Sequence, residues 1–163
     1  MTFPEIAMLR RGNGARTDQA LMFDFAAGAS LRVAERWHLS SQLGLNLFGA
    51  HVIARASVAP SFGLRPFIGV RYMVLPISVC VDDSAKCPLE VASDSAVSGG
   101  AGFGPAAEVG ISFAIRGRKK GTLLLSASYM AAHLTGRTEE NTEVPFSGLY
   151  DGLVFSLGMI NGQ

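Results

Sequence analysis

Two-residue alternation of large apolar with small or polar side chains runs along most of this chain. In residues 21–33, one face carries Leu, Phe, Ala and Val, whereas the other carries Met22, Asp24, Gly28, Ser30 and Arg32. A period of two predicts β-strands, because successive side chains of a strand point to opposite faces. An oily face opposite a small or charged face is typical of a barrel wall with lipid outside and a narrow polar interior.

Alternating segments of this kind can be laid out as about eight strands. Residues 1–18 are the least regular part, a weak first strand (3–9) and a polar loop. The clearer segments are 20–34, 38–48, 52–64, 67–75, 106–116, 122–132 and 150–160. Short connections alternate with longer ones, of which residues 76–105 form the longest outer loop. We therefore expect residues 1–163 to form one all-β domain, an antiparallel up-and-down transmembrane β-barrel.

Composition agrees with a barrel of this kind. Hydrophobic residues make up 48% of the chain and charged residues only 17%, compared with about a quarter charged in soluble domains. No apolar run reaches the roughly 18 residues of a transmembrane helix. A net charge of +1 gives no sign of the basic surface that binds nucleic acid. The first residues lack the basic and apolar regions of a signal peptide, so we expect the export signal to have been removed, or the start to have been assigned too late.

With its strands laid out, the chain resembles the small eight-stranded outer-membrane barrels of Gram-negative bacteria, the OmpA/OmpX-like class. The residues that carry the resemblance are segments 21–33, 39–48 and 107–116, and the turn and strand Arg65-Pro66-Phe67-Ile68-Gly69-Val70-Arg71-Tyr72. The likeness spans about residues 20–160. It implies a monomeric, structural outer-membrane protein that touches lipid or lipopolysaccharide, has no cofactor or catalysis, and meets an unknown protein partner through its outer loops.

Six charged side chains fall on the face assigned to the barrel interior: Asp24, Arg32, Arg55, Arg71, Glu108 and Arg116. The interior of an eight-stranded barrel is just wide enough for side chains. Charges held there must pair, because an unpaired buried charge is very costly. We therefore expect a network that fills a closed lumen. A narrow pore for ions or small solutes is the alternative.

Two further groups of residues have expected roles. Four aromatic residues near segment ends are expected to lie at the membrane interfaces, namely Trp37, Tyr72, Tyr129 and Tyr150. The two cysteines, Cys80 and Cys87, lie in one polar segment. Their proximity predicts a loop disulfide in an oxidising compartment.

Two other functions remain open at this stage. A soluble lipocalin-like barrel would bind an apolar ligand, with its oily face inside and a charged face outside. An enzyme at the outer rim would use His51 and His133 with Ser147 or Asp151. The three histidines show no metal-ligand spacing, so no metal site is expected.

Overall fold

The structure is a computed structural model that describes residues 2–13, 16–47, 49–58, 63–80, 97–116, 121–138 and 145–161. Among these residues, no helix is long and apolar enough to cross a membrane. The regular elements are the strands β1 (Thr2–Asn13), β2 (Arg16–Arg32), β3 (Trp37–Asn46), β4 (Gly49–Val58), β5 (Leu64–Cys80), β6 (Val97–Arg116), β7 (Gly121–Thr138) and β8 (Pro145–Asn161).

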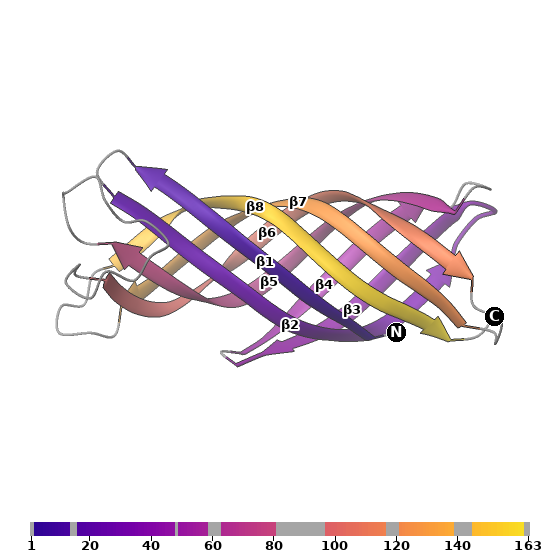
Figure 1. Ribbon diagram of the computed structural model, residues 1–163, viewed down its shortest axis with the longest axis horizontal. Coiled ribbons are helices and arrows are strands. Elements are labelled where there is room, and N and C mark those ends of the chain that lie inside the picture. The colour runs from indigo at the N-terminus through magenta and orange to yellow at the C-terminus, as the bar shows by residue number, and fades with distance from the viewer. Residues whose placement is uncertain are drawn as a thin grey trace.

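Each strand pairs antiparallel with the next, and β8 pairs with β1, so the sheet closes into a barrel. Closure leaves no strand as an open edge. The barrel is elongated and its strands are tilted, with β1 beginning and β8 ending toward the same end (Figure 1). We call this end, where β2 meets β3 and β6 meets β7, the turn end; the opposite end is the loop end. The predicted all-β, up-and-down architecture is confirmed.

The two faces of the wall follow the alternation read from the sequence. On β2, Phe25 is 66% exposed, whereas its neighbours Asp24 and Ala26 are buried. On β6, Val109 is exposed and Glu108 is buried. Shifting a strand by one residue would move its whole apolar set to the other face, so this pattern fixes the register.

The strands at the loop end are longer than the sequence predicted. β5 continues to Cys80 and β6 starts at Val97, so both ends of the expected 76–105 loop are strand, and Pro76 lies opposite Ala101. β1 and β2 pair as far as Asn13 and Arg16, within the expected 1–18 loop region. The prediction failed because the pattern reverses there: on β5, Ile77 is buried and Ser78 is exposed.

The β3–β4 hairpin is short, with 10 residues in each strand. Beyond it, residues 18–20 of β2 pair directly with residues 77–79 of β5. The Asn46 amide holds the hairpin end by donating to the Val74 carbonyl over 2.7 Å. At the loop end, the wall therefore consists of six strands. The fourth predicted segment, 52–64, is corrected to end at Val58, and Pro60 lies outside the described residues.

The interior is arranged in three layers along the barrel axis, as β5 illustrates. Toward the loop end, Met73, Leu75 and Ile77 belong to a buried apolar plug. Arg71 comes next, in a charged layer, and serines from other strands surround Arg65 near the turn end. The expected division into an oily outer face and a small or polar inner face is wrong in the plug, where Leu9, Leu134 and Phe146 are buried.

Candidate functional site

Four charged side chains from β1, β4, β5 and β6 meet in the middle of the barrel, and we call them the charged quartet: Glu5, Arg55, Arg71 and Glu108. Glu5 accepts from Arg55 Nη2 at 2.6 Å and from Arg71 Nη1 at 2.7 Å. Glu108 accepts from Arg71 Nη2 at 2.6 Å and from Arg55 Nε. All four are buried, and two carboxylates balance two guanidiniums.

The register of three strands explains how the quartet fits into so narrow an interior. Arg55 of β4 lies opposite Gly69 of β5, which lies opposite Glu108 of β6. A Cβ at Gly69 would lie 2.6 Å from Glu108 Oε1 and 2.9 Å from Arg55 Cγ. The missing side chain thus provides the room in which the pair forms. The Phe67 ring lies on the turn side, with its centroid 5.1 Å from Arg55 Cζ, within cation–π range.

A second polar group lies between β2, β3 and β4. Asp24 Oδ2 and His51 Nε2 are 2.5 Å apart, and both side chains are almost fully buried. The two atoms lie within ion-pair distance but are not aligned as a hydrogen bond, and Gln42 Oε1 also lacks a hydrogen-bond partner. The His51 ring packs over Gly44, where any Cβ would overlap it. Among the described residues, five of the seven buried side-chain polar atoms without a hydrogen-bond partner belong to this group, and such atoms are costly.

A third polar group lies nearer the loop end, around Tyr150. Its hydroxyl donates to Asp18 Oδ2 at 3.1 Å, and Arg11 Nη1 lies 3.5 Å from the same oxygen. The prediction that Tyr150 lies at the membrane interface is therefore wrong. Tyr150 shares the inward phase of β8 with Val154, whereas Tyr129 and Asp151 share the outward face and form a hydrogen bond.

The structure brings together Arg55, Arg71 and Glu108 of the six predicted interior charges, and places Asp24 against His51. The prediction for Arg32 is wrong: it is exposed at the end of β2, where its Nε donates to the Ala34 carbonyl. Because Arg32 is the last residue of β2, its side chain lies beyond the enclosed part of the barrel. For Arg116, only the backbone pairing with Thr122 is described.

Glu5 is the quartet member that sequence reasoning missed. It lies in the weak first segment, next to a proline, and so was not assigned a face. The spacing could have identified it. Glu5, Ala7 and Leu9 are two residues apart, so they share one face of β1, and all three are buried.

The remaining predicted sites have different outcomes. Trp37, Tyr72 and Tyr129 are exposed on the outer face. The rim-enzyme grouping is not assembled as predicted, because His51 is buried in the interior, whereas His133, Ser147 and Asp151 lie on the exposed face of β7 and β8. Cys87 lies outside the described residues, so the Cys80–Cys87 disulfide stays a prediction. In the described part of the chain, no three His, Cys, Asp or Glu side chains gather as metal ligands.

The charged layer separates a polar cavity from the apolar plug. The cavity, of about 50 Å³ near the turn end, reaches Arg55, and its lining includes Ser30, Ser40, Ser57, Ser112 and Ser126. On the other side of the quartet, Met73, Leu75, Met130 and Leu134 are almost fully buried. Chemically, the quartet ties four strands together by charge-assisted hydrogen bonds, which are about twice as strong as neutral ones.

Comparison with known proteins places no relative beside this chain. No family model, no curated protein and no solved structure matches it. The barrel's own outer and inner surfaces therefore carry the chemistry that indicates its function.

Proposed function

We propose that this chain is an integral β-barrel of the bacterial outer membrane, a structural, surface-exposed protein without catalysis. The observation that carries the proposal is the outer face, because every strand exposes at least one large hydrophobic side chain there. We call this surface the apolar belt; one member from each of β1 to β8 is Ile6, Phe25, Leu43, Val52, Ile68, Ile111, Leu125 and Phe155.

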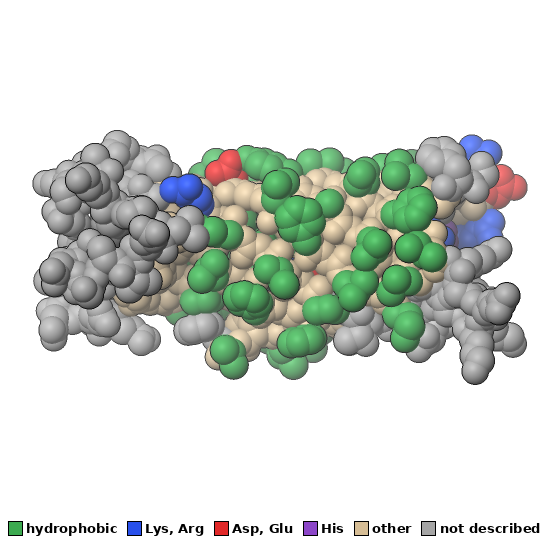
Figure 2. All heavy atoms as spheres, in the orientation of Figure 1, with side chains coloured by type: hydrophobic (Ala, Val, Ile, Leu, Met, Phe, Trp, Pro, Cys, Tyr) green, Lys and Arg blue, Asp and Glu red, His purple; other side chains and the backbone are tan. Residues whose placement is uncertain are grey.

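The apolar belt is too extensive for a surface in water. Soluble monomers rarely expose contiguous apolar patches larger than a few hundred Å². Figure 2 displays hydrophobic side chains over the middle of the barrel, with charged side chains toward the two ends. In lipid such a surface carries no free-energy penalty for exposing apolar groups. A closed barrel also pairs its backbone N–H and C=O groups between its own strands.

The limits of the belt support the same proposal. Trp37 lies beside the turn at one end, and Tyr129 bonds to Asp151 on the outer face of β7 and β8. Aromatic rings with a polar group are typical of membrane–water interfaces. Further along β7 the exposed residues include His133 and Arg137, so the loop end of the strand extends into a polar environment.

The distribution of polarity favours this function over the two barrel alternatives. A soluble lipocalin-like barrel would direct its oily face inward, whereas here Phe23, Phe25 and Leu31 are each at least 65% exposed. A conducting pore needs an open lumen, whereas the charged quartet and the apolar plug fill this one.

Gel mobility in the presence and absence of detergent tests the proposal. The full chain, folded in a nonionic detergent, is expected to migrate differently before and after heating and to insert into lipid vesicles. Planar-bilayer recordings are expected to give no unitary conductance. A protein that stays monomeric and soluble without detergent and shows no heat-dependent band shift would contradict membrane insertion, and steady unitary currents would contradict the closed lumen.

A further inference from the structure

The polar cavity near the turn end combines hydrogen-bond donors with positive charge. Besides its serines, it is lined by His38 of β3, Arg65 of β5 and Arg55 of the charged quartet, and we call it the turn-end pocket. Among the described residues, its lining includes no carboxylate. Its volume of about 50 Å³ is several times the roughly 10–15 Å³ that one water molecule needs. A group the size of a small oxyanion therefore fits.

The turn-end pocket has an excess of positive charge. Arg55 is balanced by the two carboxylates of the quartet, but Arg65 is outside that network. At the mouth, Arg32 lies opposite His38 in the same inward row, and both Arg65 and Arg32 act electrostatically on the His38 ring. Among the described residues, no carboxylate lies within ion-pair distance of Arg65 or Arg32. Two guanidinium charges therefore converge on the pocket without a counterion from the barrel.

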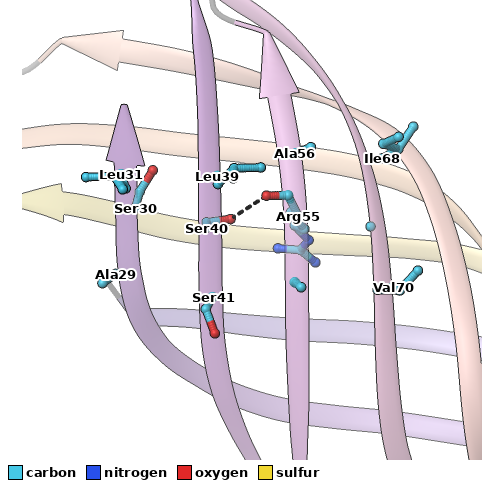
Figure 3. A pocket seen from close by; sticks show the side chains of 12 residues that line it. Ala29, Ser30, Leu31, Leu39, Ser40, Ser41, Arg55, Ala56, Ile68 and Val70 are labelled. Carbon is cyan, nitrogen blue, oxygen red and sulfur yellow. Dashed lines mark hydrogen bonds between the residues drawn. The ribbon is translucent and has the colours of Figure 1, made fainter. Parts of the chain in front are cut away.

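Strand register places hydroxyl groups around the same space. Ser30, Ser40 and Arg55 lie side by side on β2, β3 and β4, and the Ser40 hydroxyl donates to the Arg55 carbonyl at 3.5 Å (Figure 3). That bond uses the Ser40 hydrogen within the wall. In contrast, Ser57 and Ser126 donate to no side chain or carbonyl of the described residues. Their hydroxyl groups can donate to a ligand in the pocket.

We propose that the turn-end pocket binds a phosphate group as its dianion. The phosphate oxygens accept hydrogen bonds from the Arg65 guanidinium, from Arg32 at the mouth and from serine hydroxyls. Guanidinium groups recognise phosphate well because they donate paired hydrogen bonds. The two uncompensated guanidinium charges match the two negative charges of hydrogenphosphate or of a phosphomonoester. This site goes beyond a structural role, and it does not depend on the lipid outside, because the pocket lies within the barrel.

Two sources supply a phosphate dianion at this end of the barrel. One is the aqueous phase, which holds free phosphate and soluble phosphomonoesters. The other is a phosphomonoester headgroup of a lipid in the nearby leaflet. The experiment therefore uses inorganic phosphate in one arm and phosphatidic acid in detergent micelles in the other, at about pH 8, where a phosphomonoester is dianionic.

The histidines of the chain provide built-in reporters. There are three: His38 lines the turn-end pocket, His51 is buried against Asp24, and His133 is exposed on β7. The full chain is labelled with ¹³C in its histidine rings and kept in nonionic detergent at constant ionic strength, with chloride as the exchanged anion. Phosphate is expected to shift the NMR signals of His38 along a saturating curve with one site per protein, and to leave those of His133 unchanged.

Substitutions separate a built site from a general attraction of anions to this end of the barrel. Arg65→Gln is expected to weaken phosphate binding about tenfold, and Arg65→Lys by less, because lysine keeps the charge but not the paired donors. Ser57→Ala/Ser126→Ala changes no charge and is expected to weaken binding about threefold to tenfold. Arg36→Gln is the matched control, because it removes the same charge from the exposed turn after β2. Its affinity is expected to stay at the wild-type value.

Each result supports or overturns the phosphate site. Saturation by inorganic phosphate supports a soluble ligand, whereas saturation by phosphatidic acid alone supports a lipid headgroup. A His38 response that does not saturate with either probe would overturn the site, and so would equal losses in Arg65→Gln and Arg36→Gln. The heat-dependent band shift checks that each variant is folded. If Arg65→Gln does not fold, the double serine variant decides, and an unchanged affinity there would overturn the site.

Discussion

Neutralising Glu108 is expected to destabilise the barrel strongly, because it leaves a buried charge without its partner. Glu108→Gln keeps the size of the side chain but removes the charge that accepts from Arg55 Nε, Arg55 Nη2 and Arg71 Nη2. The quartet then holds two guanidiniums against one carboxylate, Glu5. Breaking a buried ion pair on one side costs about 3–5 kcal/mol, because an uncompensated charge is left behind.

A second substitution separates the charge effect from simple loss of contacts. Arg71→Gln alone leaves the quartet with excess negative charge, and its expected cost is similar. In the double variant Glu108→Gln/Arg71→Gln, Glu5 and Arg55 remain as a neutral pair, 2.6 Å apart. The double variant is therefore expected to lose about 1–3 kcal/mol less than the sum of the two single variants.

Urea unfolding from lipid vesicles measures these costs, with Trp37 fluorescence as the signal. Glu35→Gln, at an exposed turn position, is the matched control and is expected to stay within about 0.5 kcal/mol of the wild type. A cost for Glu108→Gln within that range, or single costs that simply add, would contradict a buried, mutually compensated quartet.

Three further predictions use the same unfolding assay. Ile111→Arg, in the apolar belt, is expected to lower the free energy of unfolding in a bilayer by about 2–4 kcal/mol. His133→Arg, beyond the belt on β7, is expected to change it hardly at all. Equal costs would contradict the membrane position. Tyr150→Phe loses the bond to Asp18 and is expected to cost about 1–2 kcal/mol, more than Tyr129→Phe on the outer face; the reverse order would show that Tyr150 is not buried. Gly44→Ala puts a Cβ into the His51 ring and is expected to cost about 1–3 kcal/mol, whereas Gly99→Ala, which meets nothing within 4 Å, is the neutral control.

The wall of the barrel could be predicted from the sequence because its signal is local. Wherever the outside is uniformly apolar, the face of each residue follows from its neighbours, as for Phe25 beside Asp24 or Val109 beside Glu108. The interior position of Arg55, Arg71 and Glu108 followed from the same phase, and the limited width of an eight-stranded barrel implied that such charges pair. Which of the six predicted interior charges share one layer did not follow from the sequence.

The loop end could not be predicted because its inner face is apolar and part of its outer face is polar, the opposite of the pattern along the rest of the wall. There Ile77 and Phe146 are inside, whereas Ser78 and Ser147 are exposed. The sequence rule that places oily residues outside holds there for Phe103 and Leu149 but fails for Ile77 and Phe146. Tyr150 was placed at an interface because it lies near the end of its predicted segment. The β2–β5 pairing joins residues almost 60 positions apart and leaves no local pattern.

Partners across the lumen were also out of reach of the sequence. Glu5 pairs with Arg55 and Arg71 only because β1 and the distant β4 and β5 curve around the same axis. The turn-end pocket likewise depends on serines of β2, β3, β4, β6 and β7 being brought around one cavity. Alternation assigns each of these residues to a face but not to a neighbour.

Spin-label accessibility along β6 tests the membrane-barrel account most directly. Nitroxide labels are placed one at a time from position 108 to position 115, in a background with both cysteines replaced by serine and with the protein in lipid vesicles. For an inserted barrel, collisions with oxygen are expected to peak at positions 109, 111, 113 and 115, and a water-soluble nickel chelate is expected to be excluded from these four. Free access of the nickel chelate to the same four positions would contradict it.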